Sequence, residues 1–370
     1  IHYGGIVMDN IKRCAVCLIC LLVMASCLCI KARAAEPAIA ARAAALIDMS
    51  TGKVIFEKNG SMQLPMASTT KIMTTLLTLE AGDLDSYFEV DPNAIKVEGS
   101  SMGLKEGCLV TRRMLAYGMM LPSGNDAANS AAVSVAGSID DFVRMMNDRA
   151  AQMGLDNTHF VTPSGLDDYT SDHYSTALDM SYLTANALKN ETFKQVCQTR
   201  SIKLEFGDGK EFWLANTNRL LDSCEGVIGV KTGFTDKAGR CLVSACTRNG
   251  VTLICVTLND PNDWYDHTNL YDYGFGMYEN CEFGGVSLKI PCASAENGGF
   301  VVASSDGFEL PLMECDYPRV ERLVLLPRFV YCDGMCDECN DDEPVEPVSV
   351  GRVIYLLDGC IIAQKELYIR

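Results

Sequence analysis

The chain reads Pro65-Met66-Ala67-Ser68-Thr69-Thr70-Lys71-Ile72-Met73 where an apolar, helix-prone run begins. Ser68 and Lys71 are three positions apart, so on a helix they share a face and the lysine amine can reach the serine hydroxyl. That hydroxyl is a weak nucleophile until a neighbouring base takes its proton. A lysine can be the base only if desolvation or nearby positive charge lowers its pKa. By itself, the spacing fits an N-capping serine followed by a solvated lysine better than it fits a nucleophile and its base.

Two further motifs follow in the chain. Ser123-Gly124-Asn125 comes directly after Pro122 and between two helical segments, which predicts a tight loop that projects both polar side chains. Lys231-Thr232-Gly233, followed by Phe234 and Thr235, ends an apolar strand, where a lysine taken alone is often a solvated edge charge. In the order Ser-x-x-Lys, Ser-x-Asn and Lys-Thr-Gly, the three motifs together are the signature of the penicillin-recognising serine acyl-transferases.

The sequence around these motifs resembles the D-alanyl-D-alanine carboxypeptidases, the low-molecular-mass penicillin-binding proteins of the bacterial cell wall. The resemblance extends over nearly all of residues 38–275. It implies an α/β (α+β) fold of the serine β-lactamase/transpeptidase type, in which an antiparallel sheet carries a helical lobe, plus a C-terminal all-β domain. The similar stretches are residues 44–48, 51–54, 66–74, 99–102, 121–128, 157–160, 175–177, 216–221 and 229–235.

The resemblance also implies a reaction, in which the terminal D-alanine is removed from peptidoglycan stem pentapeptides through an acyl-enzyme on Ser68. Lys71 would take the serine proton, helped by the nearby charge of Lys231. Ser123 would relay a proton to the departing D-alanine, and Asn125 would orient the base. The backbone N–H groups of Ser68 and Phe234 would hold the oxyanion. Substrate binding falls to Lys231, Thr232, Gly233, Phe234 and Thr235.

Penicillin mimics the dipeptide and is expected to acylate Ser68 and remain bound, while no metal or cofactor is required. Some relatives bind the substrate carboxylate with an arginine in the loop after the Lys-Thr-Gly strand, but here residues 259–267 contain none. Carboxylate binding would therefore depend on Lys231 and its hydroxyl neighbours, with Arg240 as a further candidate. His173 and His267 are expected to serve packing or hydrogen bonding, not catalysis.

Two rival functions share this fold. A class A β-lactamase carries the same motifs, but it needs a glutamate between the second and third to activate the deacylating water. Residues 107–190 contain no glutamate. The second rival is a non-catalytic penicillin-binding or regulatory wall protein, which would have no need to keep all of Ser68, Lys71, Ser123, Asn125 and Lys231.

The pattern of apolar residues predicts strands first, helices in the middle and strands again. Such an order implies a sheet in which N-terminal and C-terminal strands meet around an inserted helical lobe. The expected strands are 43–48 and 53–57, joined by a Gly-containing turn, then 227–231, 241–247 and 251–258, the last two joined by Arg248-Asn249-Gly250. The expected helices are 68–79, 114–143 with a break at 122–125, 144–153 and 176–188. After Tyr278 only strands are expected, the last over 361–369.

Composition indicates a globular protein, and the N-terminal segment predicts that it is exported. The hydrophobic content is 48% with 21% charged residues, and the net charge of −17 argues against a nucleic-acid partner or a basic membrane-docking face. Lys12 and Arg13 precede the uncharged apolar residues 14–30, and an Ala-Arg-Ala follows at 32–34. We therefore expect a signal peptide over 1–34, a catalytic domain over 35–275 and a C-terminal β-rich domain over 278–370. Lipoprotein processing at residues 24–27 is the alternative.

The predicted location is extracytoplasmic, in the cell wall or at the outer face of the cytoplasmic membrane, with peripheral membrane association allowed. Cysteine usage is unusual for this location, because five of the 18 cysteines fall within residues 1–34 and leave an odd number, 13, for the rest. Many of these, such as Cys246 and Cys255, lie in apolar runs and are interpreted as buried hydrophobic residues. Cys332, Cys336 and Cys339 have metal-like spacing, but an acidic hairpin with one disulfide is favoured over zinc.

Overall fold

The computed structural model describes residues 35–167, 170–293, 299–331 and 347–369. Residues 1–36 and 37–370 separate into two units, and the second contains the elements named here. The expected signal peptide, the lipoprotein site at 24–27 and the Cys332, Cys336 and Cys339 cluster lie outside the described residues. Within the described residues, no helix is both long and apolar enough to cross a membrane.

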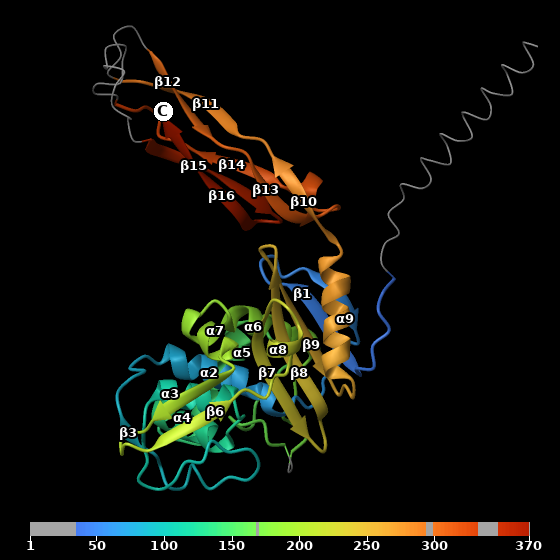
Figure 1. Ribbon diagram of the computed structural model, residues 1–370, viewed down its shortest axis with the longest axis vertical. Helices are drawn as coiled ribbons and strands as arrows, with labels where there is room; N and C mark the ends of the chain where they lie inside the picture. The colour runs from blue at the N-terminus through green and yellow to red at the C-terminus, as the bar shows by residue number, and fades with distance from the viewer. Residues whose placement is uncertain (1–34, 168–169, 294–298, 332–346, 370) are drawn as a thin grey trace, which may run out of the picture. The chain divides into compact units, whose positions relative to one another are not determined.

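A five-stranded antiparallel sheet organises the N-terminal two thirds of this unit (Figure 1). Its order is β2-β1-β9-β8-β7, so the first strand of the chain pairs with β9, from Ala43 opposite Leu258 to Asp48 opposite Leu253. This pairing confirms the expectation that N-terminal and C-terminal strands meet. The strands are β1 (Ala43–Asp48), β2 (Val54–Lys58), β7 (Val227–Thr235), β8 (Gly239–Arg248) and β9 (Val251–Leu258).

Both faces of the sheet are buried, and successive side chains of a strand enter two different cores because they point to opposite faces. Ala43, Ala45 and Ile47 of β1 belong to the core under the helical lobe, whereas Ala44 and Leu46 belong to the core under α9. The sheet is thus the middle layer of three, with the helical lobe and α9 on opposite faces (Figure 1). The helices are α2 (Lys71–Glu80), α3 (Arg112–Met120), α4 (Asn125–Ala136), α5 (Ile139–Gln152), α6 (Ala177–Ala187), α7 (Glu191–Gln198), α8 (Leu220–Ser223) and α9 (Asp263–Phe275).

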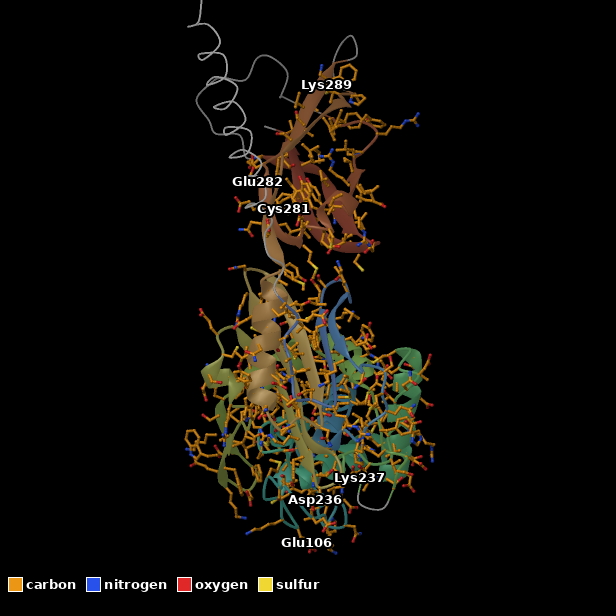
Figure 2. The ribbon with its side chains drawn as sticks, turned by 90° about the vertical axis from the view of Figure 1, so that its right-hand side faces the viewer. Glu106, Asp236, Lys237, Cys281, Glu282 and Lys289 are labelled. Atoms are coloured by element: carbon orange, nitrogen blue, oxygen red, sulfur yellow. The ribbon has the colours of Figure 1, made fainter. Side chains whose placement is uncertain are left out.

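The helix boundaries differ from the expected ones at identifiable residues. The helix expected to run through to residue 143 breaks at Gly137, whose φ of 81° ends α4, and Ser138 then caps α5 by accepting from the Asp141 N–H. Residues 263–267, expected in a loop, instead begin α9. The strand expected to end at Lys231 continues to Thr235, because β8 pairs with it along its whole length. The turn after it carries Asp236 and Lys237 (Figure 2).

Several small elements were not expected from the sequence. They border the helical lobe and the sheet, and each is too short or too irregular for periodicity to reveal. They are β3 (Phe88–Glu89), β4 (Leu109–Val110), β5 (Ser201–Glu205) and β6 (Glu211–Ala215), together with α7 and α8. The first residues of the helix expected over 68–79 instead form a 3-10 turn, η1 (Ala67–Thr70).

From Tyr278 onward the described residues form strands, as expected, and one short 3-10 turn that was not expected. Five strands form one sheet in the order β11-β12-β16-β15-β14, and β10 pairs with β13. Stacked and edge-on contacts among Phe283, Phe308 and Tyr355 fill part of this core. The elements are β10 (Tyr278–Phe283), β11 (Val286–Pro291), β12 (Phe300–Ser305), β13 (Phe308–Met313), η2 (Tyr317–Arg319), β14 (Glu321–Leu325), β15 (Val348–Leu357) and β16 (Cys360–Ile369).

Candidate active site

Ser68 lies in a tight 3-10 turn, η1, directly before α2, where the sequence had predicted the first turn of an α-helix. The turn begins at Ala67, whose φ of 49° is rare for a residue with a side chain. The hydroxyls of Thr69 and Thr70 donate to the carbonyls of Met66 and Ala67, at 2.6 and 2.8 Å. These bonds hold the nucleophile on a fixed turn at the start of the helix.

Lys71 is the first residue of α2, and its side chain is completely buried. Its Nζ atom lies 3.0 Å from Ser68 Oγ, 2.7 Å from Asn125 Oδ1 and 2.6 Å from the backbone oxygen of Ser164. The Asn125 amide is fixed in this orientation, because its Nδ2 donates to the carbonyl of Glu98 at 2.7 Å. The predicted contact between the lysine and the serine is therefore present.

The environment of Lys71 favours the neutral amine. Burial lowers the pKa of Lys71 well below its usual 10.5, and the charge of Lys231 lowers it further, while Asp126 acts in the opposite direction. A neutral amine has two hydrogens and one lone pair. Asn125 Oδ1 and the Ser164 carbonyl can only accept, so they take the two hydrogens and the lone pair is left for the Ser68 hydroxyl. This is the arrangement that a general base requires.

The second motif forms the predicted tight loop between α3 and α4. Ser123 has a φ of 66° and is 8% exposed, and Asn125 is the first residue of α4. Gly124 is packed so closely that an added Cβ would lie 2.9 Å from the Met102 nitrogen. Next to this loop, the Asp126 carboxylate accepts from the backbone N–H groups of residues 102, 103 and 104 and so fixes the neighbouring loop.

The third motif lies along β7, the edge strand next to the nucleophile. Gly233 approaches the turn so closely that an added Cβ would be 3.1 Å from the Ser68 nitrogen. Lys231 is 1% exposed and its Nζ donates to the Thr232 carbonyl at 2.8 Å. Burial lowers the pKa of Lys231 to about 7. The side chain of Thr232 points to the opposite face of the strand from that of Lys231, and its hydroxyl is 2.8 Å from the Thr217 hydroxyl.

These elements enclose a cavity of about 360 Å³. Ser68, Ser123 and Thr232, one residue from each motif, contribute to its wall, whereas Lys71 and Lys231 are buried behind it. Phe234 is 63% exposed at the rim, and the Thr235 hydroxyl lies 3.4 Å from Asp167 Oδ2. The lining residues are Ser68, Ser100, Pro122, Ser123, Thr217, Arg219, Thr232, Gly233, Phe234, Arg240, Cys241, Asp263 and Trp264.

A family model described as D-alanyl-D-alanine carboxypeptidase matches residues 30–262, which is more than half of the chain. The chain belongs to this family. The D-alanyl-D-alanine carboxypeptidase DacF of Bacillus subtilis is 36% identical over 255 residues, which cover 67% of this chain and 65% of that protein. The D-alanyl-D-alanine carboxypeptidase DacA of Escherichia coli is 36% identical over 355 residues, which cover 90% of this chain and 83% of that protein.

A solved structure agrees with this membership. The Streptomyces K15 DD-transpeptidase aligns with a TM-score of 0.61 at 34% sequence identity, covering 65% of this chain and 99% of that one. Coverage of the relatives is uneven, because the chain spans just under two thirds of the Bacillus protein and more than four fifths of the Escherichia protein.

In this member of the carboxypeptidase family, an arginine reaches the cavity from β8. Arg240 lies opposite Phe234 in the strand pair, and alternation puts its side chain on the same face as those of Thr232 and Phe234. Asp263, at the start of α9, accepts from Arg240 Nε and Nη2, and the guanidinium lies 5.5 Å from the ring centre of Trp264. The side chain of Arg240 is 42% exposed, and that of Asp263 is 4% exposed.

Several contributors to this carboxypeptidase-family site were not predicted from the sequence. Ser164 acts through its backbone oxygen, so no side-chain motif marks it, although Pro163, Ser164 and Gly165 together are a turn signal. Asp263 and Trp264 were noted only as members of a loop without arginine. Arg219 was quoted within a family-like stretch, with no reason to connect it with the cavity that it lines.

Proposed function

We propose that this protein is a serine-type D-Ala-D-Ala carboxypeptidase that removes the terminal D-alanine from peptidoglycan stem pentapeptides. The observation that carries the proposal is the position of Lys71 Nζ, 3.0 Å from Ser68 Oγ, with its other two partners able only to accept hydrogen bonds. Both relatives named above are called D-alanyl-D-alanine carboxypeptidases.

In the proposed reaction, Ser68 Oγ attacks the carbonyl carbon of the penultimate D-alanine while neutral Lys71 takes the hydroxyl proton. The backbone N–H groups of Ser68 and Phe234 stabilise the oxyanion, which the close approach of Gly233 to the nucleophile turn supports. The hydroxyl of Ser123 passes its proton to the nitrogen of the leaving D-alanine and regains one from protonated Lys71, so that both residues return to their starting state. Water then attacks the ester on Ser68 and releases the shortened peptide. Each of these steps uses groups of the chain and water, without a metal or cofactor.

The terminal carboxylate of the substrate is proposed to bind beside β7. Thr232 offers a hydroxyl at the cavity wall, with Thr235 further along the same strand. The buried amine of Lys231, which is partly protonated at neutral pH, lies behind Thr232, and Arg240 supplies a partly exposed guanidinium on the cavity side. Together they provide the positive potential and donors that a carboxylate requires. β-Lactam antibiotics, which carry an equivalent carboxylate, are the expected inhibitors.

We further propose that residues 1–34 are a signal peptide, 35–275 the catalytic domain and 278–370 a C-terminal β-rich domain. The protein would then act outside the cytoplasm, in the cell wall or at the outer face of the cytoplasmic membrane, with peripheral association allowed. The charged, apolar and small-residue segments of the N-terminal sequence support this location. Sequencing the N-terminus of the protein from native cell fractions tests the proposal, and Ala35 is the expected first residue.

The activity is tested by incubating the purified protein with diacetyl-L-Lys-D-Ala-D-Ala and, separately, with fluorescent penicillin. We expect release of free D-alanine and a stable fluorescent adduct on Ser68. The Ser68→Ala variant should lose both signals, and Thr69→Ser serves as a control within the same turn. Release of D-alanine by Ser68→Ala would refute the serine mechanism.

The same two reagents separate the rival functions. Rapid turnover of the penicillin, with little release of D-alanine, would indicate a β-lactamase. Absence of both signals would indicate a non-catalytic wall protein. Two observations favour the carboxypeptidase over the β-lactamase, which needs a glutamate as the base for its deacylating water. Residues 107–190 contain no glutamate, and the atoms that hydrogen-bond to Lys71 Nζ in the described part of the chain are a hydroxyl, an amide oxygen and a backbone carbonyl.

A further inference from the structure

His173 connects the nucleophile turn to the loop that faces it. The imidazole is 1% exposed, and its Nε2 lies 2.8 Å from the Thr70 hydroxyl, two residues after the nucleophile. On its other side, Nδ1 accepts from the backbone N–H of Val161 at 2.9 Å. The ring is further enclosed by an edge-on contact with Phe160.

The hydrogen positions in this chain of bonds follow from the partners. The Thr70 hydroxyl gives its one hydrogen to the Ala67 carbonyl, at 2.8 Å, so it can only accept from His173. Nδ1 of His173 accepts from Val161, so the ring hydrogen must be on Nε2, which donates to Thr70. Each bond therefore has a fixed direction, from Val161 through His173 and Thr70 to the carbonyl next to Ser68.

The loop of residues 161–165 lies along the start of α2 and is attached to it at successive residues. Thr74 Oγ1 donates to the Pro163 carbonyl at 2.6 Å, and Lys71 Nζ lies 2.6 Å from the Ser164 oxygen. Gly165 packs directly on the turn, because an added Cβ would collide with the Ala67 carbonyl. At the Val161 end, the loop is attached through the hydrogen bond from the Val161 N–H to His173. His173 therefore helps to fix the position of the Ser164 carbonyl.

We infer that His173 is a positioning residue for catalysis, which holds the Ala67–Thr70 turn and the Ser164 carbonyl in register so that the lone pair of Lys71 points at Ser68. This role rests on the proposed function of the Ser68 and Lys71 pair. It requires a neutral ring with one donor and one acceptor, and no proton leaves or enters the ring during the reaction.

The surroundings keep the ring neutral. Burial lowers the pKa of His173 to about 3, and any positive charge on the nearby His159, Lys237 or Lys71 side chains acts in the same direction. The ring is therefore uncharged at neutral pH and above. The charged groups that set the pKa of Lys71 are Lys231 on β7 and Asp126 on α4. A pH effect of replacing His173 would thus report on Lys71 and not on the histidine itself.

The chain contains a matched control. His267 on α9 is also completely buried, and it bonds to two hydroxyls, Ser244 at 2.6 Å and Thr257 at 3.0 Å. Burial lowers its pKa to about 3 as well. It lies on the face of the sheet opposite the nucleophile turn, so its loss removes a buried, hydrogen-bonded histidine without touching Lys71.

The test compares His173→Leu, His173→Gln and His267→Leu in the full chain. The rate constant for acylation by fluorescent penicillin is measured across pH, and kcat and KM for diacetyl-L-Lys-D-Ala-D-Ala are measured separately. His173→Leu is expected to lower kcat about ten- to hundredfold with little change in KM, because a displacement of the reacting groups by about 1 Å costs up to a hundredfold. It should also shift the midpoint of the pH profile to higher pH, since a loosened loop admits water to Lys71 and burial is the largest cause of its lowered pKa.

His173→Gln should recover most of the activity and the wild-type midpoint, because a side-chain amide offers one donor and one acceptor. His267→Leu should lower the melting temperature but leave the midpoint in place. An unchanged midpoint in His173→Leu, an equal shift in His267→Leu, or no recovery in His173→Gln would overturn the inference. If His173→Leu does not fold, Thr70→Val, which removes the receiving hydroxyl, must give the same shift. A wild-type protein that releases no D-alanine would instead refute the proposed function.

Discussion

Arg240 and Asp263 form a double hydrogen-bonded ion pair at the rim of the catalytic cavity, with Nη2 2.6 Å from one carboxylate oxygen and Nε 3.1 Å from the other. The pair joins β8 to the first residue of α9. Among the described residues, Nη1 of Arg240 has no hydrogen-bond partner. The aspartate therefore fixes the guanidinium plane and leaves one nitrogen available to a substrate carboxylate.

Replacing Arg240 by glutamine should lower kcat/KM for diacetyl-L-Lys-D-Ala-D-Ala about ten- to hundredfold, mainly through KM. The expected loss corresponds to one charged hydrogen bond, about 1.5–3 kcal/mol. Asp263→Asn should have a smaller effect in the same direction, because the guanidinium stays but is held less firmly. Arg113→Gln, which breaks an exposed pair with Asp85, is the control and should leave kcat/KM unchanged. Equal values of kcat/KM for Arg240→Gln and the wild type would exclude Arg240 from binding the substrate carboxylate.

Replacing Lys231 by methionine should shift the pH profile of acylation. When Lys231 is protonated, its charge lowers the pKa of Lys71, so the removal of that charge raises the pKa of Lys71. Less Lys71 is then neutral at a given pH, and the rise of the acylation rate moves to higher pH. The rate constant with fluorescent penicillin, measured from about pH 5 to 10, checks this direction. Lys96→Met on the surface should keep the wild-type midpoint. A midpoint that moves to lower pH in Lys231→Met would contradict the conclusion that the charge of Lys231 lowers the pKa of Lys71.

Gly165→Ala should reduce both stability and acylation. Gly165 has a φ of 88°, and its added Cβ would collide with the Ala67 carbonyl and lie 2.9 Å from Thr70 Oγ1. We expect a loss of about 2–4 kcal/mol in the free energy of unfolding, from backbone strain plus overpacking. Gly154→Ala is the matched control, because Gly154 has a φ of 71° with nothing within 4 Å of the added Cβ. Denaturant unfolding should give a loss of only about 1 kcal/mol for the control.

Cys241 should resist alkylation although it lines the cavity. It is 1% exposed, and burial raises the pKa of its thiol to about 12, so almost no thiolate exists at neutral pH. Iodoacetamide at about pH 7.5 is therefore expected to modify the exposed Cys315 and to spare Cys241 in the folded protein. Mass spectrometry of the peptides distinguishes the two sites. Modification of Cys241 as fast as Cys315 would show that the cavity floor opens.

Short-range patterns and ordered motifs predicted much of the fold. The hairpin turn at Asn249 and Gly250 was predicted from residue type, and both residues have the positive φ angles that the turn demands, 49° and 81°. The meeting of β1 with β9 followed from the order of strands and helices. The break at Gly137 and Ser138 was missed, because apolar spacing continues across it and only the cap reveals the helix end.

The candidate site was predictable where side chains carry the chemistry and not where the backbone does. Ser68, Lys71 and Asn125 were expected together and are hydrogen-bonded. The Ser164 carbonyl was not expected, since any residue type provides a carbonyl and only the path of the loop brings this one to Lys71. The same holds for Asp263, because an aspartate after a strand is common and its pairing with Arg240 depends on where α9 begins.

The pairing of β1 with β9 has a consequence for how the protein is made. More than 200 residues separate the paired strands, and the whole helical lobe lies between them in sequence. Contacts between such distant segments form late, because the chain must first close a very large loop. Ser68 is synthesised early, but the strand that carries Gly233 against it comes 165 residues later. A nascent chain that is still emerging therefore has no assembled nucleophile, and it gains one only when its last sheet strands arrive.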